Sequence, residues 1–337
     1  MENEAVRQVR IDPLPADLLK LLCCPACRKS LANSDNGVRC PACGRHFPEI
    51  RGVLRFVDEG NYAESFGYQW RQFRKTQLDH ASRHLSELDF VRKTGLRPED
   101  VKGKLVLDVG CGMGRFAEVV TRWGGRVVGI DLSAAAEVAA TNLSDRDFVA
   151  FQADLFLLPF ALETFDCIYS MGVLHSTPDC EKAVKALPQY LRPGGTLVVW
   201  LYSGYNKWYR FADHYRKITA NISPHKLHIV LRLTVPFFYW LDRRLRLAPI
   251  VGKPVAGVIH HLFPVSRHPD PEVRVLDTLD WYSPKYQSKH TYAQVFRWFE
   301  SCGLQELTVG EVAVGIRGKK PSTTGWSENK SAEKPSA

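Results

Sequence analysis

The sequence predicts an α/β fold with a Rossmann-like parallel sheet, and the prediction rests on three observations. Five short apolar runs alternate with helix-like segments between residues 105 and 201. The first run, in LVLDVGCGMGRF, ends in Asp108 and leads into a turn with three closely spaced glycines. Two further runs also end in an aspartate. Because the carboxyl ends of parallel strands meet at one edge of a sheet, these residues are expected to surround one ligand site.

The glycine turn after the first strand favours close contact between a ligand and the backbone. A β-carbon would block the tight turn and keep the ligand from the N–H groups at the start of the next helix. The dinucleotide fingerprint G-x-G-x-x-G requires a glycine at position 115, where this chain has Arg115. The chain instead reads D-x-G-x-G-x-G, a pattern that resembles that of class I S-adenosylmethionine-dependent methyltransferases.

The resemblance implies a seven-stranded methyltransferase sheet and a site for S-adenosylmethionine. Asp131, at the end of the second apolar run, is placed to accept hydrogen bonds from both ribose hydroxyls, and the resemblance puts Asp154 beside the adenine. An NAD-binding oxidoreductase stays open on the same topology, because Asp131 would serve its ribose equally. The missing third glycine and the LRPGG element before the fifth run count against it. The expected donor-binding residues are Asp108, Gly110, Cys111, Gly112, Gly114, Asp131, Leu132, Asp154, Leu155 and Ser170.

Four cysteines near the N-terminus predict a structural zinc site. They form two C-x-x-C pairs with twelve residues between the pairs, and turn-forming residues flank each pair. Two such knuckles supply the tetrahedral sulfur set that zinc prefers, and four protein ligands leave no position for water or substrate. Two redox pairs or free thiols are the alternative, and the neighbouring Cys23 is interpreted as a packed thiol. The expected ligands are Cys24, Cys27, Cys40 and Cys43.

The chain is predicted to divide into a leader, a zinc ribbon, a linker, a catalytic domain in two parts, an insertion and a tail. Residues 14–58 resemble the small zinc-ribbon family that includes the activator subunit of several translation-related methyltransferases. In the linker, Tyr62, Phe66, Trp70 and Phe73 follow a spacing typical of one amphipathic helix, which either closes the cofactor cleft or packs in the core. The expected boundaries are 1–13 for the leader, 14–58 for the ribbon, 59–100 for the helical linker, 101–201 and 291–317 for the methyltransferase domain, 202–290 for the insertion and 318–337 for a disordered tail.

The insertion is predicted to form a helical cap that binds the acceptor, because it enters above the carboxyl ends of the strands. Part of it is both apolar and cationic, and prolines break it into pieces too short to span a bilayer. Such pieces are compatible with lying on a membrane or lining a pocket for a lipid-like acceptor, and an ordinary packed cap is equally open. Its last part, DWYSPKY with KHTYAQVFRWF, resembles an element of bacterial methyltransferases of the Methyltransf_11 type. In this position the residues able to face the acceptor are Asp280, Tyr282, Tyr286 and His290.

The net charge of +9 over 337 residues invites a nucleic-acid hypothesis. The basic residues are dispersed and no RNA-binding fold is evident, so an rRNA or tRNA methyltransferase is kept as the alternative. No apolar stretch reaches the ~18 residues of a membrane span, and the N-terminus lacks the apolar region of a signal peptide. The expected location is the cytoplasm, and peripheral contact with a membrane is compatible with the sequence.

Two histidines are the candidate catalytic residues. Methyl transfer from a sulfonium is an in-line displacement, so the protein mainly aligns the reactants and excludes water. An acceptor that loses a proton also needs a base, and the ordinary pKa of a histidine suits His175 or His290 to that role, although either can instead be a packed residue. The expected function is methyl transfer to an oxygen or carbon of a small-molecule or lipid-linked acceptor. A noncatalytic partner protein that only binds the donor is a further alternative.

Overall fold

The computed structural model describes residues 16–58, 60–79, 84–205, 210–248 and 250–322. The expected leader, residues 1–13, and residues 323–337 of the expected tail lie outside the described residues. Within the described ranges, no helix combines the length and the apolar character needed to cross a membrane.

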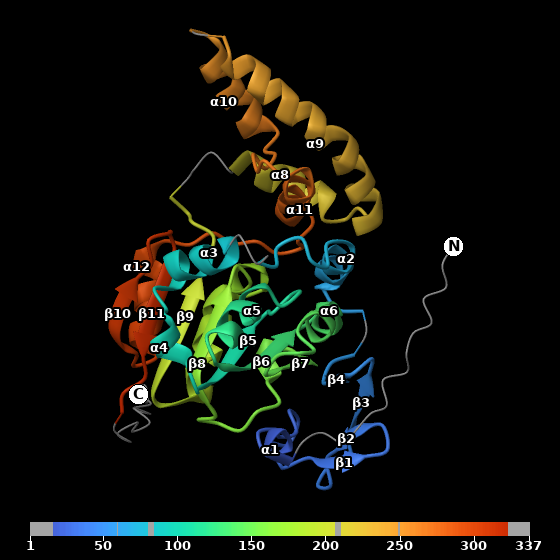
Figure 1. The fold of residues 1–337 in the computed structure, drawn as a ribbon, viewed down its shortest axis with the longest axis vertical. Helices are drawn as coiled ribbons and strands as arrows, with labels where there is room; N and C mark the ends of the chain where they lie inside the picture. Colours follow the sequence, from blue (N-terminus) through green and yellow to red (C-terminus); the bar gives the residue numbers. More distant parts are fainter. Residues whose placement is uncertain (1–15, 59, 80–83, 206–209, 249, 323–337) are drawn as a thin grey trace, which may run out of the picture.

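One sheet of eleven strands runs through the described part of the chain (Figure 1). In chain order the strands are β1 (Ala32–Ser34), β2 (Gly37–Arg39), β3 (His46–Ile50), β4 (Val53–Arg55), β5 (Leu105–Val109), β6 (Arg126–Asp131), β7 (Phe148–Gln152), β8 (Phe165–Met171), β9 (Leu191–Trp200), β10 (Gln305–Val309) and β11 (Gly315–Lys319). Their spatial order is β1-β2-β3-β4-β7-β6-β5-β8-β9-β11-β10. The sheet is longer than the seven strands expected, because β4 pairs with β7 and carries the other N-terminal strands with it.

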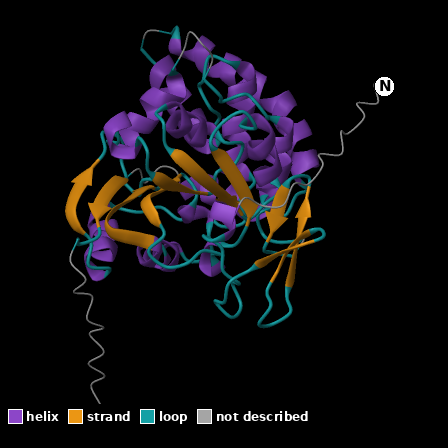
Figure 2. Cartoon of the chain, turned by 60° about the horizontal axis from the view of Figure 1, so that its bottom comes forward, coloured by secondary structure: helices purple, strands orange, loops and turns teal. Residues whose placement is uncertain are grey.

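The central strands all run in one direction. From β4 through β7, β6, β5 and β8 to β9, every neighbouring pair is parallel, whereas β11 is antiparallel to both β9 and β10. The carboxyl ends of β5 to β9 therefore meet at one edge of the sheet, where α/β folds bind their ligands. Figure 2 shows the strands as a band with helices on both sides of it.

Helices cover both faces of the sheet. In chain order they are α1 (Ala16–Leu19), α2 (Glu64–Gln72), α3 (Leu85–Thr94), α4 (Pro98–Val101), α5 (Arg115–Arg122), α6 (Ala135–Asn142), α7 (Cys180–Ala186), α8 (Arg210–Thr219), α9 (Pro224–Arg246), α10 (Gly252–Leu262), α11 (Pro271–Tyr282) and α12 (Tyr292–Ser301). One buried cluster joins α3, α4 and α5 to the sheet, and another joins α7, α12 and the cysteine segment to it. The cysteine segment (residues 16–58) thus shares a hydrophobic core with the central strands.

The helix expected from the aromatic spacing is α2, with Tyr62 and Phe73 just outside its ends, and a separate helix, α3, follows it in the linker. The carboxylate of Asp79 accepts the backbone N–H groups of Ser86 and Glu87 at 2.7 and 3.2 Å, at the start of α3. An acidic acceptor that satisfies the free N–H groups of a first turn is a helix start signal, so a new helix begins here.

The cysteine segment is bound tightly to the domain. Arg28, whose φ is +61°, donates from its guanidinium to the backbone oxygens of Leu158 and Phe160 at 2.8 and 2.6 Å. The thiol of Cys23 donates to the same Phe160 oxygen at 3.1 Å and is buried. Cys23 is therefore the packed thiol that the sequence predicts.

The described part of the insertion, α8 to α11, lies beyond the carboxyl ends of the strands, and α9 and α10 project from the molecule as a hairpin (Figure 1). Asp270 caps α11 by accepting the N–H groups of Glu272 and Val273, and Pro271 occupies the first helical position. At the other end of the chain, β11 reaches Lys319 and the N–H of Lys320 donates to Gly195 at 2.8 Å. The first residues of the expected disordered tail are therefore part of the sheet.

Candidate functional site

A cavity of about 290 Å³ opens at the carboxyl ends of β5, β6, β7 and β8. Residues from the strand ends line one side of it, and residues of α2 and α11 line another. Most of the expected donor-binding residues come together here. Gly110, Cys111, Gly112, Asp131, Leu132, Asp154 and Leu155 line the cavity, whereas Asp108, Gly114 and Ser170 do not.

The turn between β5 and α5 requires glycine at two positions. Gly110 has a φ of +81° and donates its N–H to the oxygen of Ile130 at 2.8 Å. A β-carbon on it would lie 2.4 Å from the side chain of Val173. Gly112 has a φ of +54°, and a β-carbon on it would lie 3.0 Å from Nε1 of Trp70 on α2. Both the backbone conformation and the close approach of α2 therefore exclude a larger residue.

Asp131 is held in place by three hydrogen bonds at the end of β6. Its Oδ2 accepts the N–H of Gly112 at 3.0 Å, and its Oδ1 accepts the N–H and the hydroxyl of Ser133 at 2.8 and 2.7 Å. Burial raises the pKa of the Asp131 carboxyl, while these bonds favour the charged form and oppose the rise. A fixed carboxylate at this strand end is able to accept hydrogen bonds from the hydroxyls of a nucleoside ligand.

Asp108 and Ser170 support the cavity from behind. The hydroxyl of Tyr169 donates to Asp108 at 2.9 Å, and burial raises the pKa of Asp108 to about 8. The hydroxyl of Ser170 donates to the backbone oxygen of Val109 at 2.8 Å. Both side chains join β5 to β8, so they hold the strand ends in position and do not face the ligand space.

The aromatic residues of the linker lie over the cavity. Tyr62, Phe66 and Trp70 line it together with Gln69, whereas Phe73 is 2% exposed and packs with the hydrophobic residues of the insertion. The N-terminal linker and the insertion are thus connected through α2.

Charged groups surround the other end of the cavity. Asp277 and Asp280 come from α11, Lys93 from α3 and Arg115 from the first position of α5. Lys93 and Arg115 share the carboxylate of Asp89 at 2.8 and 3.1 Å, and burial lowers the pKa of both basic groups. The sequence analysis missed Lys93, Arg115 and Asp277 as site residues, because no local motif distinguishes them from surface charges.

Asp280 is the buried carboxyl group best placed to take a proton. The hydroxyl of Tyr202 donates to its Oδ2 at 2.8 Å, and Gln69 donates to its Oδ1 at 3.4 Å. Burial raises the pKa of Asp280 to about 6, so the group is mostly ionised at neutral pH. The two tyrosines that were also expected to face the acceptor, Tyr282 and Tyr286, do not line the cavity.

Neither candidate histidine lines the cavity. His175 is buried with its ring stacked on Tyr202 at 3.9 Å between centroids, and burial lowers its pKa to about 3. His290 has its Nε2 2.7 Å from the hydroxyl of Ser288 and its ring against Trp298. The sequence placed His175 just past the fourth strand and His290 at a junction between a loop and a helix. In the structure Tyr202, which stacks on His175, lines the cavity.

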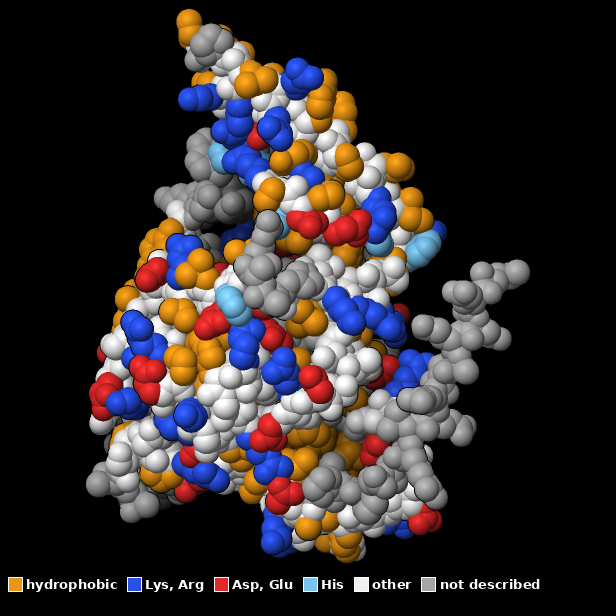
Figure 3. All heavy atoms as spheres, viewed as in Figure 1, with side chains coloured by type: hydrophobic (Ala, Val, Ile, Leu, Met, Phe, Trp, Pro, Cys, Tyr) orange, Lys and Arg blue, Asp and Glu red, His pale blue; other side chains and the backbone are white. Residues whose placement is uncertain are grey.

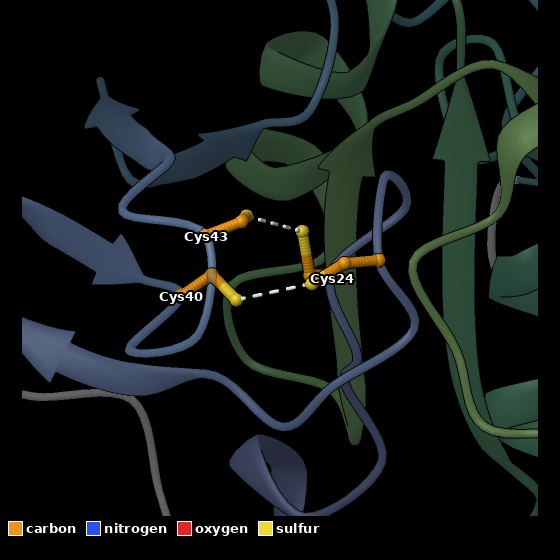
Figure 4. Close-up of side chains that lie close together, drawn as sticks. Cys24, Cys40 and Cys43 are labelled. Atoms are coloured by element: carbon orange, nitrogen blue, oxygen red, sulfur yellow. Dashed lines mark hydrogen bonds between the residues drawn. The ribbon is translucent and has the colours of Figure 1, made fainter.

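The four cysteines of the quartet lie close together, and Figure 4 shows Cys24, Cys40 and Cys43 directed toward one another. The sulfurs of Cys24 and Cys43 are 3.6 Å apart, those of Cys27 and Cys40 are 3.4 Å apart, and all four lie within 4.8 Å of one another. A tetrahedral zinc with Zn–S bonds of about 2.3 Å places its sulfurs about 3.8 Å apart. The arrangement of the thiols therefore fits a zinc ion.

The two cysteine knuckles have the same backbone hydrogen bonds. The oxygen of Cys24 accepts the N–H of Arg28 at 2.8 Å, and the oxygen of Cys40 accepts the N–H of Gly44 at 2.9 Å. Arg28 and Gly44 both have a positive φ. Two turns of equal geometry thus direct two thiols each toward the shared point.

Comparison with known proteins agrees with this geometry. Residues 107–199 match a family model described as "Methyltransferase domain". A sterol 24-C-methyltransferase from Saccharomyces cerevisiae is 31% identical over 174 residues, which cover 49% of this chain and 44% of the relative. A ubiquinone biosynthesis O-methyltransferase from Coxiella burnetii is 34% identical over 100 residues, which cover 29% of this chain and 43% of the relative.

A solved S-adenosylmethionine-dependent methyltransferase from Mesorhizobium loti is 30% identical, with a TM-score of 0.31, and the match covers 34% of this chain and 53% of that chain. The chain spans less than half the length of the sterol and ubiquinone relatives. The matched residues 107–199 extend from β5 to β9 and include the glycine turn, Asp131 and Asp154. Residues 107–199 are therefore similar to a methyltransferase domain, and the strands and helices that they form have an α/β arrangement.

Proposed function

We propose that the protein transfers the methyl group of S-adenosylmethionine to an oxygen or carbon of a small-molecule or lipid-linked acceptor. One observation carries the proposal: a single cavity joins the glycine turn and Asp131 to a second group of charged and aromatic residues from the insertion. A methyltransferase needs this continuity, because the donor methyl and the acceptor atom must meet in line.

The donor is proposed to bind at the strand ends. Asp131 would hold the ribose, Asp154 would lie beside the adenine, and the backbone of Gly110 and Gly112 would lie against the methionyl part. The donor supplies an electrophilic methyl group on a positively charged sulfur. The carboxylates of Asp131 and Asp154 line the cavity at the strand ends and suit a cationic ligand there.

The acceptor is proposed to bind between α2 and α11. Trp70, Trp200 and Trp281 line this side and offer flat apolar surface, so an aromatic or otherwise apolar acceptor fits it. The names of the sterol and ubiquinone relatives point to the same kind of acceptor. A long RNA would instead need a basic surface around the opening of the cavity. The basic residues that line the cavity are Lys93 and Arg115, and both form ion pairs with Asp89.

Asp280 is proposed as the base that removes the acceptor proton. It faces the cavity, it is ionised above pH 6, and Tyr202 fixes its orientation. His175 then serves to position Tyr202 through ring stacking, and His290 holds the segment that follows the insertion. This assignment replaces the histidine bases expected from the sequence.

The cysteine quartet is proposed to hold a structural zinc ion. Cys24, Cys27, Cys40 and Cys43 would each donate one thiolate, and the ion would cross-link the two knuckles. The quartet lies on the cysteine segment and none of its residues lines the cavity, so the metal takes no part in methyl transfer.

The function is tested with tritium-labelled methyl donor and three separate acceptor pools: total RNA, a lipid extract and a small-metabolite extract. We expect label in the lipid or metabolite pool. Label found in RNA alone would identify the RNA methyltransferase alternative. Donor binding by calorimetry with no transfer to any pool would identify the noncatalytic donor-binding alternative.

Replacing Asp131 with alanine is expected to weaken donor binding about 10- to 150-fold. The change removes charge-assisted hydrogen bonds of about 1.5 to 3 kcal/mol and releases the Gly112 turn. Isothermal titration with S-adenosylmethionine measures the effect, and the exposed Asp145→Ala variant serves as the control with unchanged affinity. Equal affinities for wild type and Asp131→Ala would remove Asp131 from the donor site.

The rate of methyl transfer is expected to fall as the pH drops through about 6. Protonation of Asp280, whose pKa burial raises to about 6, removes the base in that range. The Asp280→Asn variant should lower kcat about 10²- to 10⁴-fold, and its rate should no longer fall as the pH drops through about 6. The Asp280→Glu variant should keep this acidic limb of the pH profile. The measurement is the initial rate against pH with the acceptor found in the labelling experiment. A limb that persists in Asp280→Asn argues for another base.

One zinc ion per chain is expected in the purified protein. The Cys43→Ser variant, at an exposed position of the quartet, should lose the metal because zinc needs all four thiolates. Cys23→Ser, beside the quartet but outside it, should keep the metal. Metal analysis by mass spectrometry measures both. A metal-free wild type, or equal zinc content in the two variants, would reject the assignment.

A further inference from the structure

The hairpin of α9 and α10 (residues 224–262) exposes an unusual amount of apolar surface. Of the twenty-one large hydrophobic side chains that are exposed in the described part of the chain, eleven belong to this hairpin. At its tip, Leu247, Ile250 and Val251 are 75%, 86% and 66% exposed. In Figure 3 the projecting end of the molecule shows hydrophobic and basic side chains side by side.

Helix α9 is apolar on two opposite sides. One stripe, with Leu227, Leu231 and Val235, is buried and belongs to the core of the insertion. A second stripe, with the helical spacing of Val230, Leu233, Phe237, Trp240 and Leu247, is exposed. Leu233 and Phe237 are 74% and 55% exposed. The inner stripe accounts for the packing of the helix, so the outer stripe is left without a structural role within the described chain.

The charge of the hairpin is strongly positive. Its residues include six lysines and arginines and one acid, Asp242. This acid is buried and already bound by Arg246 and Arg267 at 2.8 and 2.9 Å. Arg243 and Arg244 lie beside the rings of aromatic neighbours at 5.9 and 5.8 Å. The basic residues of the hairpin are Lys226, Arg232, Arg243, Arg244, Arg246 and Lys253.

We propose that this hairpin docks on the surface of an anionic lipid bilayer. The apolar tip and the outer stripe enter the boundary between the lipid headgroups and the acyl chains. Trp240 lies at the level of the headgroups, and the basic residues of the hairpin bind lipid phosphates. A second copy of the chain fits this surface less well, because a symmetric contact would bring six basic residues against six. The contact lies at the surface and does not span the bilayer.

Docking would place the acceptor side of the cavity near the lipid. Helix α11 packs against α9 through Leu276 and Leu279, and the same helix carries Asp280 on the cavity wall. The docking proposal itself does not depend on methyl transfer, since it rests on the surface of the hairpin alone.

The test is flotation of the full chain with vesicles. We expect binding to vesicles of phosphatidylcholine mixed with phosphatidylglycerol, weaker binding to phosphatidylcholine alone, and release by added salt. The triple variant Leu247→Ser, Ile250→Ser, Val251→Ser should reduce binding at least about tenfold, because it removes the apolar tip. A matched variant with Leu162→Ser and Val309→Ser, two residues of similar exposure elsewhere, should bind like wild type.

Three results would overturn the proposal. Wild-type protein that fails to float with anionic vesicles has no docking surface for them. Undiminished flotation of the tip variant would place the lipid contact elsewhere. Self-association in sedimentation experiments that the tip variant abolishes, without vesicle binding, would assign the surface to a second copy of the chain. Circular dichroism of both variants checks that their helices are intact.

Discussion

The hydrogen bond from the Gly112 N–H to the carboxylate of Asp131 is the interaction on which the site depends. It joins the turn after β5 to the end of β6, so two neighbouring parallel strands end in one rigid unit. The N–H and the hydroxyl of Ser133 donate hydrogen bonds to the other oxygen of the same carboxylate and fix its orientation. A carboxylate that is held by the protein before the ligand arrives loses little freedom on binding, which is what precise recognition of a sugar requires.

Helix α2 connects the two halves of the cavity. Nε1 of Trp70 lies 3.0 Å from the position that a β-carbon on Gly112 would take, and one residue earlier Gln69 donates to Asp280 on α11. A shift of α2 would therefore move the wall of the donor side and the hydrogen-bond partner of the proposed base together. The linker also packs into the insertion through Phe73. Helix α2, which is nine residues long, thus contacts both the glycine turn and the residues of the insertion that line the cavity.

Most of the residues expected at the strand ends line the cavity, whereas most of those expected on the insertion do not, and the difference has a physical reason. Glycines in a turn and an aspartate after an apolar run are local signals, because the chain must adopt one conformation at those points. The role of Asp280 depends on where α11 packs, and that is decided by contacts far along the chain with α2 and α9. The histidines show the same limit: His175 lies near the right strand end, yet stacking behind Tyr202 keeps it from the cavity.

The cysteine segment supports the edge of the parallel sheet beside the cavity. Without β4, strand β7 would end the parallel sheet with unpaired backbone groups, and an exposed edge strand is prone to wrong pairing. The segment also reaches the site through side chains: Arg55 on β4 donates to Gln152 at 2.5 Å, and Gln152 donates to the backbone oxygen of Leu132 at 3.0 Å. Leu132 follows Asp131 and lines the cavity. The proposed metal, by holding the knuckles together, would therefore also stabilise the edge of the sheet beside the cavity.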